Sequence, residues 1–161
     1  MEIRAARGDD WGQIWPFFAR IVAAGETYAY DRDTQEDEAR RIWMVRPPGA
    51  VAVAVDSGAV IGSASMYRNR GGGGSHVASA SFMVDPDHAG KGAGRALGAH
   101  FLVWAREQGF RAAQFNSVVE TNDRAVALWR SLGFVALAAV PEAFEHPRDG
   151  RVSLLVMHTF L

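Results

Sequence analysis

A strand, a glycine-rich turn and a helix follow one another at the centre of the chain, and this order constrains the fold more than any other feature. Strand-forming residues end at Asp85-Pro86, glycine occupies positions 90, 92 and 94, and an apolar helical pattern begins directly afterwards. A helix that starts at such a turn presents unpaired N–H groups and the positive end of its dipole. Because glycine has no Cβ, a phosphate group can approach the main chain closely. The segment therefore predicts a site for a phosphorylated cofactor.

The glycine spacing excludes two common phosphate-binding motifs. A dinucleotide-binding fingerprint that begins at Gly90 requires glycine where Arg95 stands, and one that begins at Gly92 requires glycine where Leu97 stands. A P-loop requires Ser or Thr after Gly-Lys, but Gly92 follows Lys91. The remaining pattern, a strand followed by Gly-Lys-Gly-Ala-Gly-Arg, resembles the pyrophosphate loop of the GCN5-related N-acetyltransferases (GNAT), which bind acetyl-CoA.

A second motif follows at residues 121–134. Thr121 or Asn122 can cap a helix there, its apolar residues share one face, and Gly133 supplies the left-handed residue that ends it. The same acetyltransferases carry an Asn-x-x-Ala helix that ends in Gly-Phe at this distance after the glycine loop. In that family the asparagine and its helix face contact the pantetheine arm. The apolar face comprises Ala125, Leu128, Trp129 and Leu132.

Length and composition predict a single domain over residues 1–161. The chain has 161 residues, of which 48% are hydrophobic, so it can bury a core of its own but is short for two domains. The net charge of −1 indicates neither nucleic acid nor an anionic membrane as a partner. The absence of cysteine excludes an acyl-cysteine intermediate, so acyl transfer would have to be direct.

The N-terminal part has no clean apolar segment. Charges interrupt residues 1–10, and residues 11–24 are amphipathic, so we expect neither a signal peptide nor a membrane span and assign the chain to the cytoplasm. Homodimers are common in the family that the chain resembles, and the resemblance implies that this chain can form one.

The patterns along the chain predict alternating strands and helices. With the resemblance, they imply an α/β (α+β) fold of one GNAT-like domain, in which helices flank a mixed, mostly antiparallel twisted sheet. Pro47-Pro48-Gly49 closes the second helix, and residues 71–74 form a glycine hairpin loop. The expected strands are 3–6, 51–55, 60–67, 76–84, 112–118, 135–140 and 152–160, and a loop containing Pro141 and Pro147 joins the last two. The first expected helix is capped by Asp9 or Asp10, has its apolar residues between 14 and 22, and is ended by Gly25. The other expected helices are 35–45, 92–108 and the one after Asn122.

The resemblance assigns a set of cofactor contacts. Main-chain amides of the glycine loop would hold the pyrophosphate, Lys91 and Arg95 would add positive charge, and the preceding strand would offer main-chain groups to the pantetheine amides. Ala89 departs from the family, which usually has Gln or Arg at that position. The cofactor-binding set is Phe82, Met83, Val84, Ala89, Gly90, Lys91, Gly92, Ala93, Gly94, Arg95, Asn122, Ala125 and Trp129.

The catalytic residues depart further from the family. Many members have a tyrosine on the Asn-x-x-Ala helix that protonates the departing thiolate, and Trp129 occupies that position here. An indole N–H can donate a hydrogen bond but is not an acid near neutral pH. Trp129 therefore either packs in the core or contacts the pantetheine. Coenzyme A can leave as a thiolate, since an ordinary thiol has a pKa of about 8.5.

The acceptor site is assigned from the strand that contains Asn116 and from a resemblance to one subgroup of the acetyltransferases. Asn116 lies on the strand face opposite Phe115, and a buried amide requires a partner or a ligand. Three segments together, Gln-Phe-Asn at 114–116, the Thr-Asn helix start with Trp129, and residues 143–147, resemble a subgroup near the fungal acetyltransferases of proline analogues. In that subgroup, asparagines at the positions of Asn116 and Asn122 contact substrate and cofactor, respectively. A further substrate asparagine of that subgroup corresponds to Ser79. These residues suit a carboxylate, which favours an amino or imino acid, and Tyr28 belongs to the loop that would roof the pocket.

The amine must lose a proton and the thioester carbonyl must be polarised. In the family a main-chain N–H near Met83 or Val84 polarises the carbonyl, and the Asn116 amide can assist. The favoured general base is Glu26, which also lies in the roofing loop. The other candidates are His76, Glu120 and His146, and no metal-ligand spacing occurs.

Three functional interpretations remain open. The first is an acetyl-CoA-dependent N-acetyltransferase that acts on a small-molecule amine, and turnover with such an amine would distinguish it from the second. The second is an acetyl-CoA-binding regulatory module with little turnover. The third is a peptide or protein N-acetyltransferase, although no acidic cluster that would attract basic peptides is present.

Overall fold

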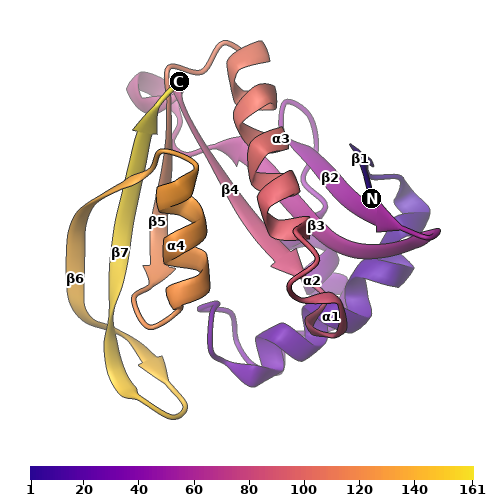
Figure 1. The fold of residues 1–161 in the computed structure, drawn as a ribbon, viewed down its shortest axis with the longest axis horizontal. Coiled ribbons are helices and arrows are strands. Elements are labelled where there is room, and N and C mark those ends of the chain that lie inside the picture. Colours follow the sequence, from indigo (N-terminus) through magenta and orange to yellow (C-terminus); the bar gives the residue numbers. More distant parts are fainter.

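The computed structural model describes all residues from 1 to 161 and contains one seven-stranded sheet in the order β1-β2-β3-β4-β5-β7-β6 (Figure 1). Every neighbouring pair is antiparallel except β4 and β5, so the expected mixed, mostly antiparallel sheet is confirmed. The strands are β1 (Glu2–Ala5), β2 (Ala50–Asp56), β3 (Ala59–Arg68), β4 (Val77–Val84), β5 (Ala112–Val119), β6 (Val135–His146) and β7 (Gly150–Phe160). The helices are α1 (Trp11–Ala24), α2 (Glu36–Trp43), α3 (Ala93–Glu107) and α4 (Asp123–Ser131).

Helices cover both faces of the sheet and create two hydrophobic cores. On one face Leu97 and Phe101 of α3 and Val126 of α4 pack with the sheet. On the other face α1 and α2 form a second core, which contains Phe18 and Trp43. Because side chains alternate across a strand, consecutive residues of β4 contribute to different cores. Figure 1 shows α3 and α4 in front of the sheet and α1 and α2 behind it.

The first helix begins and ends close to the expected residues. Its buried residues recur at helical spacing, and Gly25 adopts φ 67°, the left-handed conformation that ends a helix. Asp10 precedes the helix but makes no side-chain cap. Its carboxylate instead accepts two hydrogen bonds from Arg4, at 2.7 and 2.8 Å, and one from the Arg7 N–H, at 2.6 Å. This pairing ties the start of α1 to β1.

The sheet opens between β4 and β5. These parallel strands pair only at Val77 with Ala112 and at Ala78 with Ala113. Beyond these pairs the strands diverge toward their carboxyl ends, as Figure 1 shows. The main-chain groups of β4 that face the opening therefore have no partner strand.

The sixth strand is longer than the sequence indicates. We expect it to end at Val140, but β6 continues through Pro141 to His146. The register with β7 shifts between Val140 and Phe144, and Glu142 adopts φ 51° there. Proline is tolerated at a bulge on an outer strand because no ladder hydrogen bond requires its missing N–H. The expected loop at Pro141 is thus an irregularity within a continuous strand.

Candidate active site

A cavity of about 780 Å³ occupies the opening between β4 and β5. Residues 79–84 of β4 line one side and residues 115–119 of β5 line the other. One end reaches the glycine loop and the start of α3, and the other end reaches Tyr30 and Tyr67. The cavity therefore joins an anion-binding turn to a pocket rich in hydroxyl groups.

The glycine loop has the conformation that an anion site requires. Gly90 and Gly92 have φ values of 81° and 84°, which are strained for any residue with a side chain. The first helical hydrogen bond of α3 joins the Ala96 N–H to the Gly92 carbonyl, so the N–H groups of the first helical turn have no intrahelical acceptor. With the helix dipole behind them, these donors suit a pyrophosphate.

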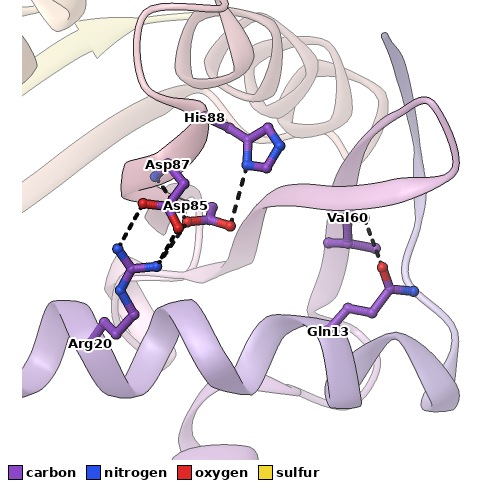
Figure 2. A network of polar contacts seen from close by, with 6 residues as sticks. All are labelled: Gln13, Arg20, Val60, Asp85, Asp87 and His88. Carbon is purple, nitrogen blue, oxygen red and sulfur yellow. Dashed lines mark hydrogen bonds and ion pairs between the residues drawn. The ribbon is translucent and has the colours of Figure 1, made fainter.

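The segment that enters the glycine loop is tied to α1 (Figure 2). Arg20 donates two hydrogen bonds to the Asp87 carboxylate, at 2.8 and 3.0 Å, and lies 3.6 Å from Asp85. Asp85 also accepts the Asp87 N–H at 3.1 Å, and its other oxygen lies 3.3 Å from Nδ1 of His88. The Arg20 guanidinium holds the pKa of Asp87 below its usual value. This network fixes the segment before the glycine loop, a task for which the short side chain of Ala89 has no polar group.

The α4 helix borders the cavity near the loop. The Asn122 Oδ1 accepts the Ala125 N–H at 3.2 Å, so Asn122 is the expected helix cap, and both residues line the cavity. Arg95 also lines the cavity and donates a hydrogen bond to the Ser131 hydroxyl at 2.8 Å. Lys91 is exposed and is not among the lining residues.

Trp129 belongs to the core and to the cavity wall. Its ring centroid lies 4.7 Å from those of both Phe82 and Phe115, and 7% of the residue is exposed. The same residue lines the cavity. The two alternatives for Trp129, core packing and a place beside the cofactor, are thus compatible, because the three rings pack together and also line the cavity.

Only alternate residues of β4 direct main-chain groups into the opening. The Asp85 N–H donates to the Ile61 carbonyl on the β3 side, so by alternation Met83 also faces β3. Phe82 and Val84 therefore face the cavity. The Phe82 N–H and carbonyl both bond to the Tyr28 hydroxyl, which comes from the segment between α1 and α2.

The far end of the cavity is polar and uncharged. Tyr30, Tyr67, Ser79, Ser81 and Asn116 line it. The Tyr67 and Ser81 hydroxyls lie 3.2 Å apart. Burial raises the pKa of Tyr30 above its usual value, so this phenol stays protonated at neutral pH.

The side chain of Asn116, which is expected on the strand face opposite Phe115, belongs to a chain of side-chain hydrogen bonds. Its Nδ2 donates to the Asn69 Oδ1 at 2.6 Å, and its Oδ1 accepts from the Gln114 Nε2 at 2.9 Å. Asn116 and Ser79 lie on opposite strands and both line the cavity. The amide is therefore held in a fixed orientation beside the pocket.

The base candidates do not converge on the cavity. Glu26 is not a lining residue, and its carboxylate pairs with Arg148 at 2.6 Å. His76 and Glu120 are exposed. His146 is buried away from the cavity, and its Nδ1 accepts the N–H groups of Arg148 and Asp149 at 3.3 and 3.2 Å. No group of three or more His, Cys, Asp or Glu side chains is arranged to hold a metal ion.

Sequence reasoning missed several lining residues. Tyr30, Tyr67, Ser81 and Arg124 line the cavity without having been selected. Ser81 could have been found, because it follows Ser79 at the period-two spacing that places both on one face of a strand. Tyr67 could not, since its approach to Ser81 depends on the pairing of β3 with β4.

A family model described as the acetyltransferase (GNAT) family matches residues 15–134. Among curated proteins, the L-amino acid N-acyltransferase MnaT of Escherichia coli is 33% identical over 146 residues, which cover 88% of this chain and 84% of MnaT. The N-acetyltransferase aca1 of Schizosaccharomyces pombe is 36% identical over 69 residues, 43% of this chain and 33% of that protein.

Solved structures match over nearly the full chain. A GCN5-related N-acetyltransferase from Kribbella flavida has a TM-score of 0.97 at 55% identity, covering 99% of this chain and 97% of that chain. The yncA structure from Salmonella typhimurium, solved with its cofactor acetyl-CoA, has a TM-score of 0.84 at 28% identity, covering 100% of this chain and 94% of that chain. None of the helices in this chain has the length and apolarity that crossing a membrane requires.

Proposed function

The chain belongs to the acetyltransferase (GNAT) family, and we propose that it moves the acetyl group of acetyl-CoA directly to the amine of a small molecule, with an amino or imino acid as the acceptor. It is an N-acetyltransferase, and acetyl-CoA is its cosubstrate. One observation carries the choice of acceptor. The cavity that starts at the glycine loop ends at an uncharged pocket lined by hydroxyl and amide groups.

The glycine loop and α4 form the cofactor half of the site. Main-chain N–H groups of residues 90–95 would hold the pyrophosphate, and the guanidinium of Arg95 would add charge. Asn122, Ala125 and Trp129 would lie along the pantetheine arm. Val84 would offer it main-chain groups, because this residue faces the cavity nearest the loop.

Acetyl-CoA supplies the acetyl group as a thioester, which an amine attacks once its carbonyl is polarised. Of the β4 residues, Phe82 and Val84 direct their N–H groups toward the cavity, whereas Met83 faces β3. The departing thiolate needs no acid near neutral pH, since an ordinary thiol has a pKa of about 8.5. Trp129 would therefore pack against the cofactor without transferring a proton.

The acceptor half rests on Ser79 and Asn116. Both line the far end of the cavity, and both offer hydrogen-bond donors that suit a carboxylate. Similarity to MnaT, an L-amino acid N-acyltransferase, supports an amino-acid acceptor. Glu26 would act at the rim, where release from Arg148 would let its carboxylate accept a proton from the incoming ammonium through water.

We extend the proposal to assembly and location. The whole chain, residues 1–161, would form the acetyltransferase domain, act in the cytoplasm where its cosubstrate is made, and pair as a homodimer. The outer strand β6 supports the dimer, because it exposes large apolar side chains: Val135, Leu137 and Val140. Light scattering on wild type and on Leu137→Glu would test this, and a wild-type monomer at micromolar concentration would contradict it.

Release of free coenzyme A thiol from acetyl-CoA tests the proposed reaction. The chain contains no cysteine, so a thiol reagent has no protein background. A panel of amino acids, imino acids, polyamines and peptides would serve as acceptors. We expect acceptor-dependent release with amino or imino acids. Turnover with peptides alone would mean that peptides, and not amino or imino acids, are the acceptors. Binding of acetyl-CoA without turnover across the panel would support a binding module.

A further inference from the structure

The Tyr28 hydroxyl lies against the main chain of Phe82, at a point where β4 has no partner strand. It accepts the Phe82 N–H at 2.8 Å and donates to the Phe82 carbonyl at 2.6 Å. The neighbouring strand β5 has already diverged, since the β4–β5 pairs end at Ala78. One phenol therefore satisfies two part-buried main-chain groups that have no partner on a neighbouring strand.

The ring of Tyr28 is fixed by its neighbours. It stacks on Tyr30 with centroids 5.4 Å apart and planes 5° from parallel, and it meets the edge of Trp43 at 6.4 Å. The hydroxyl oxygen is therefore held in place, while its hydrogen can turn about the C–O bond. Burial raises the pKa of Tyr28 far above its usual value, so the hydroxyl keeps its proton.

Phe82 lies deeper in the cavity than Val84. Two residues of an extended strand span about 7 Å. Val84 is thus the cavity-facing residue beside the glycine loop, and Phe82 is the next one toward the pocket of Ser79 and Asn116. A chain that runs from the pyrophosphate along β4 brings its reactive end to Phe82, where the Tyr28 hydroxyl already lies.

We propose that Tyr28 is a catalytic residue whose O–H donates a hydrogen bond to the carbonyl oxygen of the acetyl thioester, while the Phe82 carbonyl it releases accepts an N–H of the attacking amine. This inference rests on the proposed acetyl transfer. It requires that the hydroxyl hydrogen turn away from Phe82 and that the two oxygens, which the hydrogen bond holds at 2.6 Å, move slightly apart. The hydroxyl oxygen continues to accept the Phe82 N–H, and this polarises its own O–H toward the thioester.

The arrangement would bond the thioester and the amine to two neighbouring oxygen atoms. The Tyr28 oxygen and the Phe82 carbonyl oxygen are neighbours, joined at 2.6 Å while the hydrogen bond is intact, so groups that bond to them after it opens are held side by side. The amine nitrogen forms the new C–N bond, and the carbonyl electron pair moves to the oxygen that Tyr28 contacts. Collapse breaks the C–S bond and leaves the electron pair on sulfur. The amine loses one proton to water, and the thiolate takes one from water.

Tyr28→Phe tests the inference, because it keeps the ring and removes only the hydroxyl. We expect kcat to fall about 10- to 100-fold, the scale of losing one oxyanion donor. The KM for acetyl-CoA and the affinity for coenzyme A, which lacks the acetyl carbonyl, should change by less than about twofold. A lower KM with unchanged kcat would overturn the proposal, since it would mean that Tyr28 only obstructs the Phe82 N–H.

Infrared spectroscopy of bound acetyl-CoA, isotope-labelled at the acetyl carbonyl, needs no acceptor. Binding to the wild type should lower the carbonyl stretching frequency, because a hydrogen bond weakens the C=O bond, and Tyr28→Phe should abolish most of that shift. An equal shift in both proteins would overturn the inference while leaving the proposed acetyl transfer intact. Turnover failure across the acceptor panel, with the shift present, would instead overturn the proposed transfer.

Fluorotyrosine at position 28 provides a second variant if Tyr28→Phe does not fold. It retains both contacts with Phe82 and is the stronger hydrogen-bond donor, because fluorine lowers the phenol pKa. The carbonyl frequency should then fall further than in the wild type. An unchanged frequency would contradict a hydrogen bond from Tyr28 to the thioester.

Discussion

The proposed role of Asn122 divides its amide between the backbone and the ligand. Its Oδ1 caps α4 at the Ala125 N–H, which leaves the Nδ2 for the cavity. The Asn116 amide instead bonds to two side chains at the other end of the cavity, Asn69 through its Nδ2 and Gln114 through its Oδ1. We therefore expect Asn122 to act in cofactor binding and Asn116 in acceptor binding.

Alanine variants of the two asparagines should have different kinetic effects. Asn122→Ala should raise the KM for acetyl-CoA and lower the unfolding free energy by about 1 kcal/mol through the lost cap. Asn122→Ser, which retains a capping oxygen, should keep the stability but not the KM. Asn116→Ala should raise the acceptor KM by about tenfold, the scale of one lost hydrogen bond to a charged group. Steady-state kinetics with both substrates varied would check this, and identical profiles would contradict the division.

Residues close together in sequence were predictable, and residues brought together by strand pairing were not. The glycine loop and the Asn122 cap were identified because their chemistry lies within a few consecutive residues. The partner of Glu26 was not, since Arg148 follows β6 and reaches Glu26 only through the path of the outer hairpin. The contact between Tyr28 and Phe82 likewise depends on where the segment after α1 crosses the sheet.

At the scale of elements, α1 is tied to the segment before the glycine loop by the ion pairs of Arg20 with Asp85 and Asp87. Arg20→Gln should raise the KM for acetyl-CoA about two- to fivefold and leave kcat unchanged, because an ion pair this exposed is screened by solvent and contributes little. Reversing both charges, with Arg20→Asp and Asp87→Arg together, should restore part of the affinity. Gln13→Ala is the matched control, since Gln13 also joins α1 to the sheet but bonds to Val60, away from the loop (Figure 2). Equal effects of both α1 variants would exclude a specific role for Arg20.

The crossing of α3 and α4 depends on Gly98. A Cβ at this position would lie 2.7 Å from Leu132 and 3.0 Å from Trp129. Gly98→Ala should gain about 1 kcal/mol of helix propensity but lose about 1–3 kcal/mol to overpacking, a net destabilisation of about 1 kcal/mol. Urea denaturation would measure the change. A more stable variant would mean that Leu132 moves aside without cost.

The element boundaries show where local patterns fail. Helix α1 was predicted to end at Gly25 because the left-handed C-cap is a local signal. Strand β6 was predicted to end too early because Pro141 usually terminates a strand. Its continuation depends on the bulge and on the outer position of β6, and both follow from the pairing with β7.

For the whole molecule, the pairing of Asp10 with Arg4 predicts how stability depends on pH. The guanidinium holds the pKa of Asp10 below its usual value, and only 5% of Asp10 is exposed. A lowered native pKa gives stability that is present above the unfolded pKa of about 3.9 and is lost as the pH falls through the native value. Asp10→Asn should therefore be less stable at neutral pH, and the difference should shrink below about pH 4. A constant difference across urea titrations from neutral to acid pH would contradict this.

The two residue pairs that join β4 to β5 leave the halves of the sheet weakly connected by main-chain bonds. A ligand bound in the opening would contact both halves of the sheet. At a concentration about 100 times its Kd, it would raise the free energy of unfolding by about 2.7 kcal/mol. Limited proteolysis with and without acetyl-CoA should reveal this as slower cleavage, and equal rates would contradict it. In a cell, proteases degrade the transiently opened form first. The lifetime of this protein should therefore follow the supply of acetyl-CoA, so that a shortage of the metabolite removes the enzyme that consumes it.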